Sequence, residues 1–327
     1  MREQLEVLTT VPGAVFAVVL GLLWGSFANV CIYRWPPSEE FPRGRSVVRP
    51  GSHCSACKAP IAWYDNLPIL SYVWLRGHCR TCKAAFSPRY LLVEALTGAL
   101  FGVAWWFTLG TGGMFYPIDE RVLGFVVDAT FVFVMVVVTF IDIDHKLILI
   151  KLIVPAAIGF YVAGLLLGHV WWQGLVGAAM GYGIPWLIAW LYYRVTGREG
   201  LGLGDGFLLG AVGALLGWRG VLFAMLVGGL TGSAVTLRKL ATPGRAAMAA
   251  AAIGAIVAAG MLAGVVGAGT ALCAVLILLL VLLRRMRSDE ARELMITEIP
   301  FGPFLAMGAV FYLFAAPWIE VNFRLYS

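Results

Sequence analysis

Four cysteines in two tight pairs are the residues of this sequence best suited to chemistry. They form Cys54-Ser-Ala-Cys57 and Cys79-Arg-Thr-Cys82, two C-x-x-C motifs with 21 residues between them. Thiolates at this spacing put two sulfurs on each of two tight turns, and four sulfurs complete a tetrahedral zinc site with no position open for water. The spacing therefore predicts structural zinc bound by Cys54, Cys57, Cys79 and Cys82. Redox-active pairs and a pair of disulfides are the less favoured alternatives.

The surroundings of these cysteines agree with a small metal-dependent module. His53 and His78 each precede a motif and could replace a sulfur, but we expect them to be solvated loop residues. A module this short buries too little core to fold alone, so we expect metal binding to supply its stability. The two other cysteines, Cys31 and Cys273, lie in apolar stretches and are expected to be packing residues.

Aspartates at the ends of apolar stretches are the second candidate site. Asp142 and Asp144 follow one apolar stretch, and Asp205 opens another after a run of glycines. A carboxylate at such a depth in a membrane is costly unless it has a partner or a task. Taken singly, each has a structural explanation, because Asp142 or Asp144 could be an interfacial cap paired with Lys146 and Asp205 could be an N-cap.

Taken together, the aspartates indicate hydrolysis. The glycines before Asp205 allow a neighbouring helix to approach closely. Two carboxylates within hydrogen-bond reach cannot easily both ionise, so they share one proton. One then acts as the base on a water molecule and the other as the acid to the carbonyl or the leaving amine, which is aspartic-peptidase chemistry. Asp128 lies too far along its stretch to join such a pair.

The composition excludes a water-soluble globular protein. Apolar residues make up 61% of the 327 residues and charged residues only 13%, and the mean hydropathy is +0.87. Soluble domains carry about 45–50% apolar and about 25% charged residues. The net charge of +6 does not indicate nucleic-acid binding, because basic residues in membrane proteins gather in cytoplasmic loops.

Hydropathy predicts an all-α polytopic membrane protein with about 8–10 transmembrane helices. A helix needs roughly 20 mostly apolar residues to cross a bilayer. A longer apolar tract, 246–283, has glycines near its middle and is expected to form two helices, which brings the favoured count to about ten. The remaining expected spans are 12–33, 90–110, 122–141, 147–168, 171–193, 206–217, 219–236 and 302–318.

The basic residues predict the orientation of these spans. Nine Lys and Arg residues fall within 34–89, against three acidic residues, and this excess places the segment in the cytoplasm. We therefore expect a first transmembrane helix in 1–33, a cytoplasmic four-cysteine zinc module in 34–89 and a transmembrane peptidase domain in 90–327. The same topology puts the aspartates at the cytoplasmic face of the lipid bilayer.

Taken in order, the motifs of this chain resemble those of one protein family. They are Gly25-Ser-Phe-Ala-Asn29-Val-Cys-Ile-Tyr-Arg34, the two C-x-x-C pairs, Trp63-Tyr64-Asp65-Asn66-Leu-Pro68-Ile-Leu-Ser71, Arg89-Tyr90-Leu-Leu-Val-Glu94, Ile141-Asp142-Ile-Asp144-His145, Gly202-Leu-Gly204-Asp205 and Ile299-Pro300-Phe301-Gly302-Pro303-Phe304. The chain thus resembles the bacterial prepilin peptidases, the bifunctional leader peptidases and N-methyltransferases of type IV pilus and type II secretion systems. The resemblance covers most of the chain.

This resemblance implies a function. Asp142 and Asp205 match the catalytic pair of these GxGD-type aspartic peptidases, with Asp144 as a polar neighbour. The enzyme would cut the leader of a prepilin or pseudopilin after a Gly and then methylate the new N-terminal amine with S-adenosylmethionine. It would work at the cytoplasmic face of the bacterial inner membrane. The resemblance links the cysteine module to methyl transfer.

Three further positions match the family and are candidate binding residues. Asn29, Asp65 and Glu94 would bind the substrate amine or the methyl donor. An equally good explanation is that each satisfies a buried backbone or loop contact.

The chain also departs from the family. Leu149 and Ile150 stand where Pro-Asp is common, and Phe207 stands where a Lys is common. Losing the Lys removes a positive charge that would lower the pKa of the carboxylates. These changes motivate an alternative, a non-catalytic scaffold whose zinc module docks assembly partners. An ion-coupled transporter would explain the membrane acids but not the cysteines.

Overall fold

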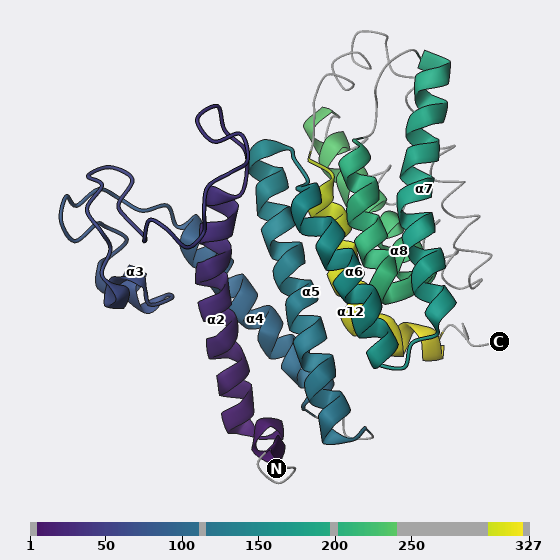
Figure 1. Cartoon of the computed structure of the whole chain (residues 1–327), viewed down its shortest axis with the longest axis horizontal. Helices are drawn as coiled ribbons and strands as arrows, with labels where there is room; N and C mark the ends of the chain where they lie inside the picture. The colour runs from purple at the N-terminus through teal and green to yellow at the C-terminus, as the bar shows by residue number, and fades with distance from the viewer. Residues whose placement is uncertain (1–4, 111–115, 197–201, 241–299, 323–327) are drawn as a thin grey trace. The chain divides into compact units, whose positions relative to one another are not determined.

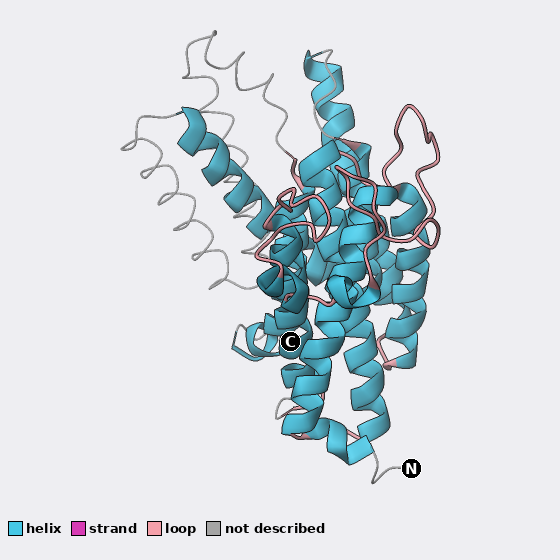
Figure 2. Cartoon of the chain, turned by 90° about the vertical axis from the view of Figure 1, so that its left-hand side faces the viewer, coloured by secondary structure: helices cyan, strands magenta, loops and turns pink. Residues whose placement is uncertain are grey.

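The computed structural model describes residues 5–110, 116–196, 202–240 and 300–322, and these are almost entirely helical outside 35–88 (Figures 1 and 2). The chain divides into two compact units, Met1–Leu149 and Ile150–Ser327. The first contains η1 (Val7–Thr9), α2 (Val11–Arg34), η2 (Trp63–Asn66), α3 (Leu70–Trp74), α4 (Arg89–Thr108) and α5 (Ile118–His145); the second contains α6 (Ile150–Leu166), α7 (Trp171–Thr196), α8 (Leu203–Leu240) and α12 (Gly302–Asn322).

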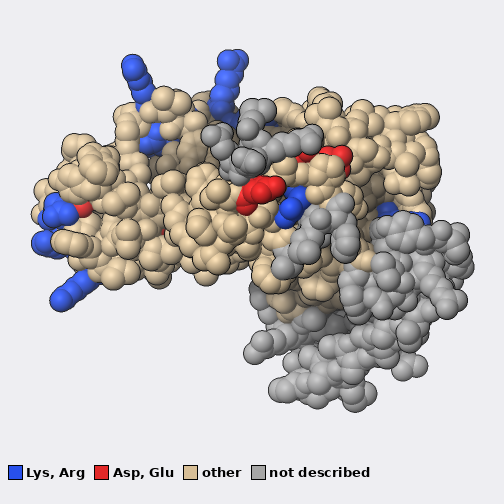
Figure 3. Space-filling view, turned by 90° about the horizontal axis from the view of Figure 1, so that it is seen from below, with Lys and Arg blue, Asp and Glu red and all other residues tan. Residues whose placement is uncertain are grey.

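Five helices of the described part are long and apolar enough to cross a membrane. They are α2, α4, α5, the Trp171–Arg194 part of α7 and the Leu203–Gly232 part of α8. Two shorter apolar stretches are α6 and the Gly302–Pro317 part of α12. Figure 3 shows that charged side chains are few among the described residues visible from that side. These features confirm the prediction of an all-α polytopic membrane protein. The predicted pair of helices in 246–283 lies outside the described residues.

One predicted boundary between spans is marked by a break inside a helix. The sequence predicts separate spans at 206–217 and 219–236, whereas the structure has the single element α8 with non-helical backbone at Gly217. Its φ of 66° and ψ of −174° are accessible to glycine because it lacks a Cβ. The predicted boundary therefore coincides with this kink.

In the first unit, α2 and α4 pack backbone to backbone. A Cβ at Gly21 would lie 2.7 Å from Phe101 Cβ, and one at Gly25 would lie 2.7 Å from Glu94 Cα. Small residues allow this approach, which gives membrane helices their van der Waals contact. The large buried side chains Phe131 and Met135 of α5 belong to the same three-helix unit, in which α2, α4 and α5 contact one another (Figure 1).

In the second unit, glycines join α7 and the first part of α8. A Cβ at Gly213 would lie 2.2 Å from the carbonyl oxygen of Gly177, and one at Gly181 would lie 2.2 Å from the carbonyl oxygen of Leu209. Backbone atoms cannot turn aside as side chains do. The α7–α8 contact therefore excludes every side chain at these positions.

This packing predicts a sharp difference between two glycines of α7. Gly181→Ala is expected to lower the free energy of unfolding by on the order of 1–3 kcal/mol, because its new methyl overlaps α8. A Cβ at Gly183 would meet no neighbouring atom within 4 Å. Gly183→Ala is therefore expected to be neutral or to stabilise the helix by up to about 1 kcal/mol. Thermal unfolding in detergent, followed by tryptophan fluorescence, measures both; equal midpoints for the two variants would contradict the packing.

Candidate functional site

The two C-x-x-C motifs fold into matching turns. The Lys58 N–H donates to the Cys54 carbonyl at 2.9 Å, and the Lys83 N–H donates to the Cys79 carbonyl at 3.1 Å. Each lysine has a φ of 59°, a left-handed conformation that turns the chain back after the second cysteine of its pair. The sequence repeat is therefore also a structural repeat.

These turns bring the four cysteines together. Their Sγ atoms all lie within 4.8 Å of one another, and the sulfurs of Cys54 and Cys82 are 3.8 Å apart. Zinc–sulfur bonds of about 2.3 Å in a tetrahedron put sulfurs about 3.8 Å apart. All four are free thiols, so the structure gives no support to the disulfide alternative.

The electrostatics of the turns also suit a metal thiolate. Hydrogen bonds from the backbone N–H groups of Cys82 and Thr81 lower the pKa of the Cys79 thiol to about 6. Those from the N–H groups of Cys57 and Ala56 lower the pKa of Cys54. At Cys82 the hydrogen bond from the Ala84 N–H lowers the pKa, but the neighbouring thiols and burial outweigh it and raise the pKa to about 11, an effect that a bound cation would relieve. Hydrogen bonds to a thiolate favour its charged form, which is the form that binds zinc. The residues present therefore fit a four-cysteine zinc site, as the spacing predicts.

The neighbouring histidines are engaged elsewhere. His53 Nδ1 hydrogen-bonds the carbonyl of Gly51 at 3.1 Å, and His78 Nδ1 hydrogen-bonds the carbonyl of Arg76 at 2.6 Å. A carbonyl only accepts, so each ring nitrogen donates. The metal-ligand cluster of the described residues contains the four cysteines and neither histidine.

Asp65 links the 3-10 helix η2 to the second cysteine turn. Its two carboxylate oxygens accept hydrogen bonds from Arg80 Nε at 2.7 Å and Arg80 Nη2 at 2.5 Å. These bonds hold the pKa of Asp65 below its usual value. The geometry fits the structural explanation for Asp65, and its binding of substrate or methyl donor stays a prediction.

Glu94 and Asn29 also make contacts between segments. Glu94 Oε2, on α4, accepts a hydrogen bond of 2.8 Å from the backbone N–H of Ile69, which precedes α3 and has a φ of 61°. Asn29 Nδ2, on α2, donates to the Tyr90 carbonyl at 3.1 Å. Glu94 thus anchors the cysteine module to a membrane helix, and Asn29 joins α2 to the start of α4.

The two aspartates at the end of α5 have different surroundings. Asp142 is buried, with 5% of its surface exposed, whereas Asp144 pairs with Arg89 at the start of α4. Arg89 Nη2 also donates to the Phe140 carbonyl at 3.1 Å. Positions two apart on a helix point about 200° apart, so only one of the two can face Arg89. Asp142 is thus the buried member of the motif, and its catalytic role stays a prediction.

The third aspartate, Asp205, lies near the start of α8, between Gly204 and Gly206. It lies half-buried in the first turn of α8, and its N–H donates to the Gly202 carbonyl at 3.2 Å. Asp142 belongs to the first unit and Asp205 to the second, so their pairing remains a prediction. Phe207, which replaces the common Lys, packs its ring 4.9 Å from that of Tyr182 on α7.

The other replaced positions lie where α5 gives way to α6. Leu149 is buried, and Ile150 is 52% exposed. The exposed Ile150 marks the position where the family commonly has a carboxylate.

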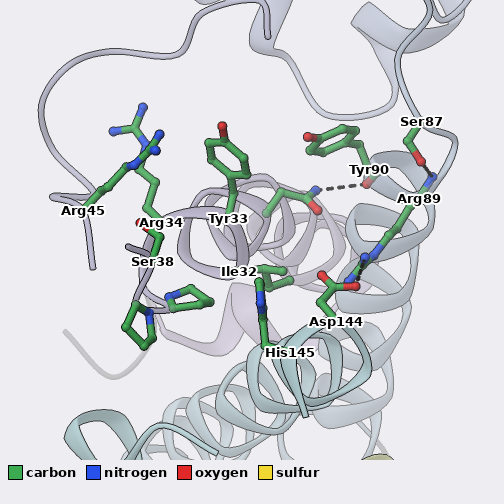
Figure 4. A pocket seen from close by; sticks show the side chains of 13 residues that line it. Ile32, Tyr33, Arg34, Ser38, Arg45, Ser87, Arg89, Tyr90, Asp144 and His145 are labelled. Carbon is green, nitrogen blue, oxygen red and sulfur yellow. Dashed lines mark hydrogen bonds and ion pairs between the residues drawn. The ribbon is translucent and has the colours of Figure 1, made fainter. Parts of the chain in front are cut away.

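A pocket in the first unit is the feature that sequence reasoning missed. It has a volume of about 360 Å³ and lies among the end of α2, the start of α4, the end of α5 and the loop after α2 (Figure 4). Buried Arg34 holds that loop through hydrogen bonds to the carbonyls of Ser46, Pro50 and Gly51. Arginines at the ends of two apolar helices, Arg34 and Arg89, are the sequence signal that could have indicated it.

Family models match both halves of the chain. The bacterial Peptidase A24 N-terminal domain matches residues 19–108, and the type IV leader peptidase family matches residues 129–237. The first match contains the cysteine module, and the second contains Asp142 and Asp205.

Individual proteins match across the same regions. Prepilin leader peptidase/N-methyltransferases are 36% identical over 234 residues in Myxococcus xanthus, covering 71% of this chain and 65% of that protein, and 35% identical over 255 residues in Aeromonas salmonicida, covering 71% and 84%. The Neisseria gonorrhoeae protein of this name is 36% identical over 255 residues, covering 69% and 83%. No solved structure matches significantly. The order of these motifs and the extent of these matches place the chain in the prepilin leader peptidase/N-methyltransferase family.

Proposed function

We propose that this chain is an inner-membrane aspartic endopeptidase that removes the leader of type IV prepilins or pseudopilins and methylates the new N-terminus. The observation that carries the proposal is the type IV leader peptidase match over 129–237. Both aspartates of the predicted catalytic pair lie inside it, one at the end of α5 and the other at the start of α8. Cleavage falls after a Gly, on the cytoplasmic side of the membrane.

In this proposal Asp142 and Asp205 share one proton. The ionised member takes a proton from water, which attacks the scissile carbonyl, and the protonated member gives its proton to the leaving amine. A helix that stays in lipid while its basic leader stays in water presents its scissile bond at this interface, where both aspartates are predicted to lie.

The cysteine module supports methylation through a structural role. Zinc bound to four cysteines has no open position, so its role is structural. Held by these four cysteines, zinc would supply folding energy that the small module cannot obtain from its own core. Glu94 and Arg34 then connect the folded module to α4 and α2.

A second candidate, the non-catalytic scaffold, rests on Phe207. Phe207 stands where a Lys is common, so this position carries no positive charge, and its ring packs against Tyr182 instead. The two candidates differ in one experiment, in which the purified full chain in detergent is incubated with a prepilin carrying a Gly-Phe junction. The peptidase yields a shortened product, and the scaffold yields none.

A further inference from the structure

The pocket of the first unit carries both signs of charge. Arg89 and Asp144 form an ion pair on its wall. Arg45 also lines it, with its guanidinium 5.9 Å from the centre of the Tyr33 ring. Figure 4 shows Asp144 and Arg89 on one side of the pocket and Arg45 on the other.

Aromatic rings supply the rest of its character. Tyr33 and Tyr90 both line the pocket and lie beside each other in Figure 4. They are 56% and 44% exposed, so their rings are accessible to a ligand. Among the described residues, the Tyr33 ring has a cation–π contact with Arg45, and the Tyr90 ring stacks on no other ring.

Size and charge together restrict the ligand. A volume of about 360 Å³ suits a molecule of nucleoside size, since ligand pockets span about 300–1,000 Å³. Three arginines and one aspartate line the pocket, and the aspartate is paired with Arg89, so the pocket attracts an acidic group and repels a basic leader peptide. The pocket therefore favours a ligand that presents a carboxylate to the arginines and an aromatic ring to the tyrosines, with room for a cationic group beside Asp144.

We propose that this pocket binds S-adenosylmethionine, the methyl donor; the inference rests on the proposed methylation. The ligand's carboxylate matches the guanidinium groups of Arg45 and Arg89. Its ammonium and sulfonium match the Asp144 carboxylate and the tyrosine faces, and its adenine matches the same aromatic surface.

The position of the pocket connects the two activities. Asp142 and Asp144 lie two residues apart on α5, about 3 Å along its axis and on different sides. The Asp-x-Asp motif thus gives one aspartate to peptide cleavage and the other to the methyl donor. The amine released by cleavage forms beside the pocket. Its neutral nitrogen attacks the methyl carbon, and the carbon–sulfur bond breaks with its electron pair remaining on sulfur. The methylated amine then loses one proton to water.

Calorimetric titration of the full chain in detergent with S-adenosylhomocysteine tests this inference. Wild type is expected to bind about one molecule per chain, and Tyr33→Ala and Arg89→Gln are each expected to weaken binding by about tenfold or more. Arg89→Gln removes an interhelical ion pair and can impair folding. Tyr33→Ala changes an exposed ring, so it keeps the test valid if the other variant fails to fold.

Matched controls are Tyr116→Ala and Arg49→Gln, exposed residues outside the pocket, which are expected to bind as wild type does. The inference is overturned if the Tyr33 variant binds as tightly as wild type, or if inorganic phosphate binds with the same dependence on these residues while S-adenosylhomocysteine does not. In both cases a wild type that still cleaves and methylates prepilin leaves the proposed function standing. A wild type that neither cleaves, methylates nor binds refutes both.

Discussion

Asp142→Asn and Asp205→Asn are each expected to lower the rate of prepilin cleavage by about 10²–10⁴-fold, the contribution of a positioned general acid or base. Asparagine keeps the size and most hydrogen bonds of aspartate but cannot take up or release a proton at neutral pH. Asp142 is buried at the end of α5, so a neutral amide is readily accommodated there. Separation of precursor and mature prepilin on a gel over time measures the rate.

Asp119→Asn is the matched control for this pair. Asp119 is exposed in the first turn of α5, at the opposite end of the helix from Asp142. Its substitution is expected to leave cleavage unchanged. Wild-type rates in both the Asp142 and the Asp205 variants would refute the catalytic assignment, whereas loss in only one would refute the shared-proton mechanism.

Replacing a zinc ligand is expected to have the largest effect on stability. Wild type should contain about one zinc per chain, and Cys79→Ser should contain almost none, because a four-sulfur site needs all its thiolates. Structural zinc sites in small domains contribute apparent binding free energies of about 10–16 kcal/mol, far more than the module can gain from its own core. Elemental analysis gives the zinc content, and limited proteolysis between residues 35 and 88 reports unfolding of the module.

Cys31→Ala is the control for the loss of zinc. Cys31 is a buried thiol of α2 that lies outside the four-cysteine cluster, so this variant should keep the metal. Wild-type protein that is folded but contains no zinc would contradict the proposed zinc site.

The apolar helices could be predicted closely from the sequence. The expected span 12–33 corresponds to α2, Val11–Arg34, and 90–110 corresponds to α4, Arg89–Thr108. Such agreement follows from the bilayer, in which every backbone polar group needs a partner and a long apolar run has few alternatives to a helix. The kink at Gly217 could be placed only as a boundary, because its geometry depends on neighbouring helices.

The cysteine site could be predicted because its determinants are local. Each pair sits on one turn of the chain, and only the meeting of the two turns depends on the fold. The contacts of Asp65, Glu94 and Asn29 with Arg80, Ile69 and Tyr90 could not be predicted in the same way. They join residues 15, 25 and 61 positions apart, and their formation depends on how α2, α4 and the loops between them pack.

The different surroundings of Asp142 and Asp144 could be predicted only in part. Helical geometry alone predicts that the two face different sides, but not that Arg89, 55 residues away, meets Asp144. The pocket beside them depends on three helix ends and a loop, and no single motif encodes it.

Mass measurement of a prepilin after incubation with the full chain and S-adenosylmethionine tests the central claim most directly. The reaction is run with wild type and with the Asp142→Asn variant, in detergent, on a substrate with a Gly-Phe junction. Wild type is expected to yield a mature chain that begins at the Phe and carries one methyl group on its N-terminal amine, whereas the variant is expected to leave the precursor intact. A precursor that wild type leaves uncut would contradict this claim.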